Sequence, residues 1–347
     1  MQRLLDPALL FFVVGALAAV LRSNLEIPPS ISRFLSLYLL MALGLKGGFA
    51  LAKSGAGGEV LACLGLAVLL ALLVPALGQR LLQRVLPGFD AAAVAATYGS
   101  VSAVTFITAV QYLDARQLPW GGHMAAAMAL MESPAIVMAV ASATALRARA
   151  AAAQGAGAVV TGGGAAVLTL GGAGAGANAT PPGRTPWGAL LREAFTDGAP
   201  LLLLGAMAVG LLSGDAGQAA MHPFSGDLFR GMLAFFLLDM GMAAARQLPA
   251  LRGCSPWLLV YAVAGPLVHA ALALLLAHLA GLHPGNGALL MVLAASASYI
   301  AVPAALRHAI PEARPALYLG LSLGLTFPLN ILLGVPLYVS LAFRVLG

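Results

Sequence analysis

Each half of this chain carries a hydrophobic segment that small and hydroxylated residues interrupt. The first is TYGSVSAVTF, from Thr97 to Phe106, and the second is SASYIAVPAAL, from Ser296 to Leu306. Each is followed by another apolar segment that contains a proline, Pro134 in the first half and Pro328 in the second. Inside lipid, an interrupted helix is tolerated only where protein or water satisfies its freed backbone groups. Such interruptions at matching positions of two halves are typical of the substrate site of a secondary transporter.

The composition requires a membrane environment. Of the 347 residues, 61% are hydrophobic and 9% are charged. A soluble domain cannot bury so much apolar surface, so we predict an all-α polytopic membrane protein. Apolar stretches recur as far as the C-terminal end, and a cleaved secretory signal is not expected. The net charge of +6 comes from basic residues in short loops, which indicates membrane orientation rather than nucleic-acid binding.

Ten apolar spans can be assigned, five in each half. They cover residues 7–22, 31–52, 59–79, 90–112, 122–146, 196–213, 229–248, 255–280, 285–306 and 315–343. The predicted domains are a first five-helix repeat (1–149), a Gly/Ala-rich cytoplasmic linker (150–190) and a second five-helix repeat (191–347). Because five is odd, the second half enters the membrane from the opposite side. We therefore expect inverted repeats related by a pseudo-two-fold axis in the membrane plane.

The distribution of basic residues predicts the orientation. With the N-terminus outside, twelve of the 18 Lys and Arg residues lie in cytoplasmic loops or span ends and five lie on the outside. Cytoplasmic loops of membrane proteins carry such an excess. We expect a multi-pass membrane protein with both termini outside. The linker is interpreted as a flexible tether, with a docking loop for a cytosolic regulator as the alternative.

The repeat extends beyond the interrupted segments. The stretch from Leu39 to Lys53 resembles the stretch from Phe236 to Leu248, and Gly44 matches Gly241. Lys46 and Asp239 fall within these two stretches as intramembrane charges. A buried charge needs a partner, and we expect these two residues to form one salt bridge across the pseudo-axis, with a role in ion coupling as the alternative.

The interrupted segments supply candidate anion ligands. Half-helix N-termini present amide hydrogens and a positive dipole end, which suit a small anion. The predicted substrate-binding residues are Gly99, Ser102, Thr105, Ser296, Ser298 and Tyr299. Small and hydroxylated residues also permit close helix packing, which is the alternative interpretation for one such segment alone. Their recurrence at matching positions favours a binding site.

A carboxylate within a span is the most distinctive single candidate. Glu132 has no basic residue near it in sequence, and a charge in the membrane is costly unless it is paired or hydrated. It is predicted to be a cation ligand or a proton acceptor, with a structural hydrogen bond as the alternative. The predicted cation-binding residues are Ser100, Glu132, Thr326 and Asn330. The chain has no recognisable nucleophile–base pair or metal cluster, so neither an enzyme nor a cofactor other than a coupling Na⁺ is expected.

Several stretches, in their order and spacing, resemble the sodium-dependent bicarbonate transporter superfamily of bacteria. They are GLKGGFAL, YGSVSAVTF, LFRGMLAFFLLDMGM, AASASYIAVPA and RHAIPEARPALYLG, together with the region around Glu132. The resemblance implies a five-plus-five inverted repeat with two crossing broken helices, in the bacterial inner membrane. It also implies a homotrimer in the lipid bilayer and an elevator-like movement of a core domain against a gate domain. Some family members are inhibited by a PII-like protein on the cytoplasmic side.

The chain departs from the cyanobacterial pattern at three positions. Tyr299 stands where the family has an Asp, Glu132 replaces another Asp, and Val104 replaces a hydroxylated residue. The predicted function is import of a small anion, with bicarbonate first, coupled to Na⁺. One alternative is Na⁺- or proton-coupled transport of another small organic anion, which the aromatic residues Tyr299 and Phe327 favour. The other is a non-transporting membrane protein that senses an anion.

Overall fold

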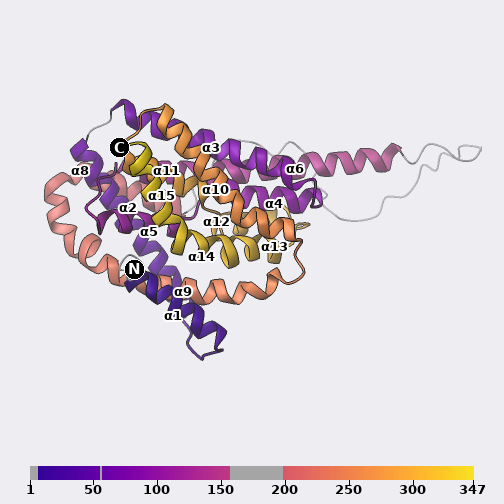
Figure 1. Ribbon diagram of the computed structural model, residues 1–347, viewed down its shortest axis with the longest axis horizontal. Coiled ribbons are helices and arrows are strands. Elements are labelled where there is room, and N and C mark those ends of the chain that lie inside the picture. Colours follow the sequence, from indigo (N-terminus) through magenta and orange to yellow (C-terminus); the bar gives the residue numbers. More distant parts are fainter. Residues whose placement is uncertain (1–6, 55–56, 157–197) are drawn as a thin grey trace, which may run out of the picture.

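The described part of the chain is helical. The computed structural model describes residues 7–54, 57–156 and 198–347, and these ranges contain no strand (Figure 1). Seven helical stretches are long and apolar enough to cross a membrane by length and composition, and Pro7–Val20 and Pro284–Ala295 are shorter apolar helices. The predicted class, an all-α polytopic membrane protein, is therefore confirmed.

The first half follows the predicted spans closely. Its helices are α1 (Pro7–Val20), α2 (Pro29–Ser54), α3 (Gly58–Leu82), α4 (Gly88–Gly99), α5 (Ala103–Asp114) and α6 (His123–Ala156). Helix α6 continues ten residues past the predicted end of its span at residue 146. Alanine has the highest helix propensity, and the Ala-rich sequence after Arg149 extends the helix. The predicted linker thus begins within α6, and its residues 157–190 lie outside the described ranges.

The second half contains more irregular helices. Its elements are α8 (Gly198–His222), η2 (Pro223–Asp227), α9 (Leu228–Gln247), η3 (Leu248–Leu251), α10 (Pro256–Leu279), α11 (Pro284–Ala295), α12 (Ala301–Ala309), α13 (Pro315–Leu319), η4 (Gly320–Thr326), α14 (Phe327–Leu329), η5 (Asn330–Gly334) and α15 (Val335–Val345). The elements η2, η4 and η5 are π-helical, and η3 is a 3₁₀-helix. Helical structure interrupted by π segments is frequent at functional sites.

Both predicted interruptions are present. Helix α4 ends at Gly99 and α5 begins at Ala103, within the predicted span 90–112. Helix α11 ends at Ala295 and α12 begins at Ala301, within the predicted span 285–306. Each break leaves the N-terminus of a new helix inside an apolar segment.

The helices pack as two groups. Helix α1 packs on α9 and α2 packs on α8, with further contact between α2 and α9; we call these four helices the frame group (Figure 1). In the remaining helices, α3 packs on α4 and α6, while α10 packs on α11 and η4; we call α3–α6 and α10–α15 the core group. The two helix breaks both belong to the core group.

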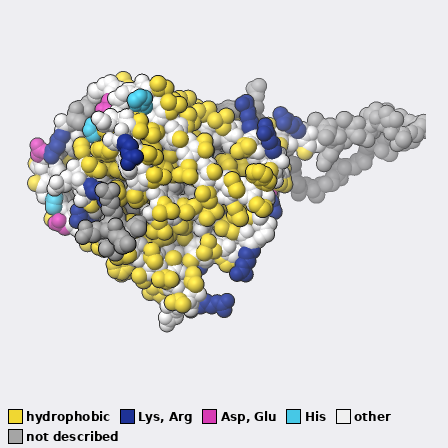
Figure 2. All heavy atoms as spheres, in the orientation of Figure 1, with side chains coloured by type: hydrophobic (Ala, Val, Ile, Leu, Met, Phe, Trp, Pro, Cys, Tyr) yellow, Lys and Arg dark blue, Asp and Glu magenta, His cyan; other side chains and the backbone are white. Residues whose placement is uncertain are grey.

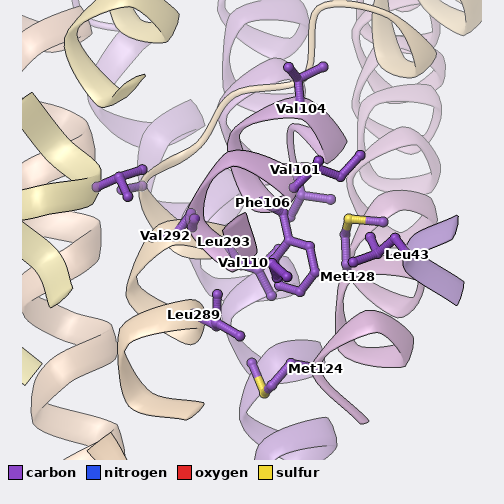
Figure 3. Packing of buried hydrophobic residues seen from close by; sticks show 14 of the residues in the cluster. Leu43, Val101, Val104, Phe106, Val110, Met124, Met128, Leu289, Val292 and Leu293 are labelled. Carbon is purple, nitrogen blue, oxygen red and sulfur yellow. The ribbon is translucent and has the colours of Figure 1, made fainter. Parts of the chain in front are cut away.

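The centre of the core group is apolar. Figure 3 shows Phe106 and Val110 of α5 among side chains of α2, α6 and α11. Their neighbours in this view include Leu43, Met128, Leu289 and Leu293. On the outside, Figure 2 shows hydrophobic side chains over most of the visible face, while charged side chains gather at its two ends. An apolar band between charged ends suits a membrane-spanning protein.

Glycines allow α1 and α9 to approach closely. A Cβ atom at Gly241 would lie 2.1 Å from the carbonyl oxygen of Phe12, and one at Gly15 would lie 2.0 Å from that of Leu238. The same device joins α2 to α8, because a Cβ at Gly44 would lie 2.4 Å from the oxygen of Leu203. Backbone atoms cannot move aside cheaply, so these glycines fix the frame group.

The substitution Gly241→Ala is expected to destabilise the protein by about 1–3 kcal/mol, the usual cost of forcing extra atoms into a packed interior. Thermal unfolding of the purified protein measures the effect. The matched control is Gly231→Ala on the same helix, where a Cβ would meet nothing within 4 Å. Equal melting temperatures for the two variants would contradict the close approach of α1 and α9.

The predicted salt bridge between Lys46 and Asp239 is wrong. Lys46 Nζ lies 3.0 Å from Asp114 Oδ2, and the Asp239 carboxylate accepts a hydrogen bond from Ser32 Oγ. Lys46 also lies over the ring of Phe229, 4.1 Å from its centroid. Phe229 precedes Asp239 by ten residues of α9, which is about 15 Å along a helix. Lys46 is therefore level with the beginning of α9 rather than with Asp239.

Candidate functional site

Ser102 begins helix α5 as its N-cap. Its Oγ accepts hydrogen bonds from the backbone N–H of Thr105 at 3.1 Å and from Thr105 Oγ1 at 2.9 Å. A serine in this position satisfies one of the backbone donors that a helix start leaves open. At the second break Ser298 Oγ accepts from the N–H of Val302 in the first turn of α12, at 3.2 Å, although the N-cap of that helix is Ile300.

The two breaks contact each other. The Ser298 N–H donates to the carbonyl of Thr97 at 2.8 Å, and the Ser102 N–H donates to Ser296 Oγ at 3.0 Å. Ser102 Oγ also donates to the phenolic oxygen of Tyr299 at 3.2 Å. Segments about 200 residues apart in sequence thus share one hydrogen-bond network, with Ser102 at its centre.

Five of the six predicted anion ligands belong to this network, and Gly99 does not. The five are Ser102, Thr105, Ser296, Ser298 and Tyr299, and all of them are buried. A Cβ at Gly99 would lie 2.5 Å from the ring of Pro75 in α3, so the missing side chain lets α4 pack on α3. The structure therefore gives Gly99 a packing contact, and its role toward an anion stays a prediction.

The arrangement suits a small anion. The first turns of α5 and α12 supply backbone N–H groups and positive dipole ends within a buried region. The hydroxyl groups of Ser102, Thr105 and Tyr299 are donors that can turn from one another toward an anion. In the described arrangement they bond among themselves, so an entering anion would replace the bond between Ser102 and Tyr299.

The predicted cation ligands form hydrogen bonds with different partners. Ser100 Oγ donates to the backbone carbonyl of Glu132 at 3.4 Å, and the Glu132 residue is half-buried. Thr326 Oγ1 donates to the carbonyl of Ala262 at 2.8 Å, while Asn330 Nδ2 donates to the carbonyl of Ala295 at 2.8 Å. The structure brings Ser100 and Glu132 together. Thr326 and Asn330 bond instead to Tyr98 and Ala262, and to Ala295 and Tyr338, respectively.

Oxygen atoms are nevertheless plentiful here. Thr326 ends the π segment η4 and Asn330 begins η5, so both lie where the regular helix is disturbed. Within the described ranges, no group of three or more His, Cys, Asp or Glu residues could hold a metal ion. The predicted cation ligands offer hydroxyl and amide oxygens and one carboxylate.

Sequence reasoning missed two tyrosines of the site. Tyr98 OH lies 2.6 Å from Thr326 Oγ1, and Tyr338 OH donates to Asn330 Oδ1 at 3.0 Å. Tyr98 belongs to the interrupted segment TYGSVSAVTF, and this position was a usable signal. No local pattern distinguishes Tyr338 from other apolar-helix tyrosines.

A cavity of about 530 Å³ lies away from the helix breaks, between the frame group and the end of α5. Its lining includes Lys46, Asp114, Trp120 and His222. Trp120 Nε1 donates to Asp114 Oδ1 at 2.8 Å, so Asp114 has both an indole partner and the Lys46 ammonium. The ion pair between Lys46 and Asp114 therefore joins the frame group to the core group beside this cavity.

Two facing helix breaks inside a polytopic helical bundle are characteristic of secondary membrane transporters. The chain matches the Na⁺-dependent bicarbonate transporter superfamily over residues 7–343 and belongs to that family. The resemblance found in the sequence is thus confirmed, and the protein is a membrane transporter rather than an enzyme. A comparison with curated protein sequences gives no match.

Proposed function

We propose that this protein imports bicarbonate together with Na⁺ across the bacterial inner membrane. Beyond family membership, the observation that carries the proposal is the meeting of two broken helices through Ser102, Ser296 and Tyr299. At each break a serine hydroxyl accepts a hydrogen bond from the first turn of the new helix. A buried pair of helix N-termini with several hydroxyl donors is complementary to a small, oxygen-rich anion.

Coupling follows from the cost of burying charge. In our proposal the anion binds at the network of Ser102, Thr105 and Tyr299, and the cation binds near Glu132. Ser100 adjoins both proposed sites, because it lies in the first break and its hydroxyl donates to the backbone carbonyl of Glu132. A bound Na⁺ neutralises the Glu132 carboxylate and lowers the repulsion that an entering anion meets. Thr326 and Asn330 complete the proposed cation ligands after rearrangement of their present bonds.

We further infer ten membrane crossings arranged as inverted repeats. The helical run Leu201–Leu251 has 51 residues, far more than the ~20 of one crossing, and accounts for two. With the two shorter apolar helices, the total becomes ten. The close contacts support the symmetry, since Gly44 packs α2 on α8 and the matching Gly241 packs α9 on α1. An inverted repeat exchanges these two helix pairs.

The proposed orientation keeps both termini outside. Figure 2 shows Lys and Arg side chains without visible acidic neighbours at the end of the molecule from which α6 extends, while Lys and Arg lie among Asp, Glu and His side chains at the opposite end. The basic end suits the cytoplasm. A homotrimer and a cytoplasmic PII-like regulator stay predictions from the family resemblance.

We propose an elevator-like movement of the core group along the frame group. In the proposed orientation, α2 ends and α6 begins on the outside. Gly122, directly before α6, lies beside Gly47, because a Cβ at Gly122 would be 1.9 Å from the oxygen of Gly47. Gly47 precedes the end of α2 by seven residues, or about 10 Å, so the core group begins below the outer end of the frame group. At the proposed cytoplasmic end, Gly324 of η4 lies against Gln247, the last residue of α9, and Gly320 lies against Leu251 of the following η3. The core group is therefore set toward the proposed cytoplasmic side, which favours an inward-directed state.

The substitution Lys46→Glu is expected to lower the uptake rate about tenfold, because it places two carboxylates together where an ion pair joins the two groups. Adding Asp114→Lys restores part of the rate by reversing the pair. Restoration stays incomplete, since Trp120 loses its acceptor. Uptake by equal amounts of reconstituted protein measures both effects. A double variant no better than Lys46→Glu would show that the pair has no role in transport.

Thermal unfolding with combinations of ions tests coupled binding. A ligand that binds only the folded protein raises the melting temperature. We expect bicarbonate to stabilise the protein in Na⁺ and to have little effect in K⁺ at the same ionic strength. Equal stabilisation in both salts would contradict Na⁺ coupling at this site, and no stabilisation in either would contradict bicarbonate binding.

An organic monocarboxylate is the second candidate substrate. The rings of Tyr299 and Phe327 lie 4.9 Å apart beside the hydroxyl network, and aromatic faces suit an organic body better than they suit bicarbonate. Unlabelled short-chain carboxylates at equal concentration would then reduce labelled bicarbonate uptake strongly. Absence of competition favours bicarbonate itself.

A further inference from the structure

An aromatic contact leads from the frame group to the candidate anion site. Phe12 of α1 lies edge-on to Phe327 of α14, with ring centroids 5.6 Å apart and an interplanar angle of 82°. Phe327 in turn contacts Tyr299, with centroids 4.9 Å apart and an angle of 57°. The Tyr299 hydroxyl accepts the hydrogen bond from Ser102. Three rings thus connect α1 to the centre of the network.

The three rings are enclosed by protein. Phe12 is 3% exposed, Phe327 is 2% exposed and Tyr299 is 7% exposed. Phe11, next to Phe12 on the same helix, is 47% exposed. Only one of two adjacent phenylalanines therefore reaches the site, which gives Phe12 a matched neighbour for comparison.

The two ends of the contact have different backbone surroundings. Phe12 belongs to a helix fixed on α9, because its own carbonyl oxygen is the atom that a Cβ at Gly241 would strike. Phe327 lies between the π segments η4 and η5, directly after Thr326. The Phe12 ring, on a closely packed helix of the frame group, therefore contacts the Phe327 ring in an irregular part of the core group.

We propose that Phe12 is a positioning residue for the transported anion. Through Phe327 it holds the Tyr299 hydroxyl beside Ser102, so the affinity of the site depends on where the core group stands along the frame group. This inference rests on the proposed function. When the core group moves along α1, Phe327 leaves Phe12 and Tyr299 loses its support, which weakens anion binding in one state relative to the other.

The test compares transport kinetics of Phe12→Ala and Phe12→Leu with those of the control Phe11→Ala. An edge-on aromatic pair contributes enough to change affinity about two- to tenfold. We expect KM for bicarbonate in Na⁺ to rise by about that factor in Phe12→Ala and Phe12→Leu, with Vmax per folded protein nearly unchanged. Phe12→Leu keeps apolar volume and guards against unfolding, and Phe12→Tyr, which keeps the ring, restores the wild-type KM. The exposed Phe11 variant keeps wild-type kinetics.

A second comparison separates positioning from a merely structural role. Tyr299→Phe keeps the ring contact and removes the hydroxyl that the contact holds. In this background Phe12→Leu is expected to change KM no further, because its effect acts through that hydroxyl. Equal effects of Phe12→Leu with and without the hydroxyl, or unchanged KM in both Phe12 variants, would overturn the proposal. Absence of Na⁺-dependent uptake by the wild type would instead overturn the proposed function, and this inference with it.

Discussion

Replacement of Glu132 by alanine is expected to abolish Na⁺-coupled uptake while the protein still inserts into the membrane. The residue is half-buried on α6, and its carbonyl accepts a hydrogen bond from Ser100 in the first helix break. Loss of a charged interaction costs roughly 1.5–3 kcal/mol, or about 10- to 150-fold in binding of the cation. Without the cation, the anion meets an incomplete site and uptake stops.

A conservative variant and a control variant accompany Glu132→Ala. Glu132→Asp keeps the carboxylate and is expected to retain part of the Na⁺-dependent uptake. Glu26→Ala removes an exposed carboxylate from the loop between α1 and α2 and should leave uptake unchanged. Labelled bicarbonate uptake into proteoliposomes, with Na⁺ and with K⁺, measures all three proteins. Normal Na⁺-dependent uptake by Glu132→Ala would remove Glu132 from the mechanism.

The substitution Ser102→Ala is expected to raise the KM for the anion at least about tenfold. One Oγ atom caps α5, contacts Thr105 and donates to Tyr299, so its removal takes a ligand from the site and releases two others. Losing the N-cap also costs about 1 kcal/mol of stability. Uptake kinetics and thermal unfolding of the same preparation separate the two effects.

Ser322→Ala is the matched control for Ser102→Ala. Ser322 is as deeply buried, but its hydroxyl donates to the carbonyl of Tyr318 one turn earlier in the same helical segment. We expect this variant to keep the wild-type KM. If both serine variants changed KM equally, the effect would reflect general loss of packing rather than binding at the helix breaks.

The positions of the helix breaks were predictable because their causes are local. Small and hydroxylated residues disfavour a continuous apolar helix. Ser102 caps α5, and the Ser298 hydroxyl accepts a hydrogen bond from the first turn of α12. The two halves of the chain also carry matching segments, so the pairing of the breaks followed from the repeat. Their contact through Ser102 and Tyr299 is consistent with that expectation.

Features that depend on the vertical register of distant helices were not predictable from one sequence. Lys46 contacts Asp114 rather than Asp239 because α2 meets α9 near Phe229. The aromatic contact of Phe12 with Phe327 likewise joins segments more than 300 residues apart. Local patterns show that such residues are buried in a span, but the depth at which two spans meet is set by packing of the whole bundle.

Labelled bicarbonate uptake by the wild-type protein in proteoliposomes tests the central claim most directly. The vesicles would carry an inward Na⁺ gradient, and a parallel sample would have K⁺ in its place. We predict accumulation above equilibrium that requires Na⁺ and that collapses when the gradient is dissipated by a Na⁺ ionophore. Uptake that is the same in K⁺, or no uptake by protein shown to be folded, would contradict Na⁺-coupled bicarbonate import.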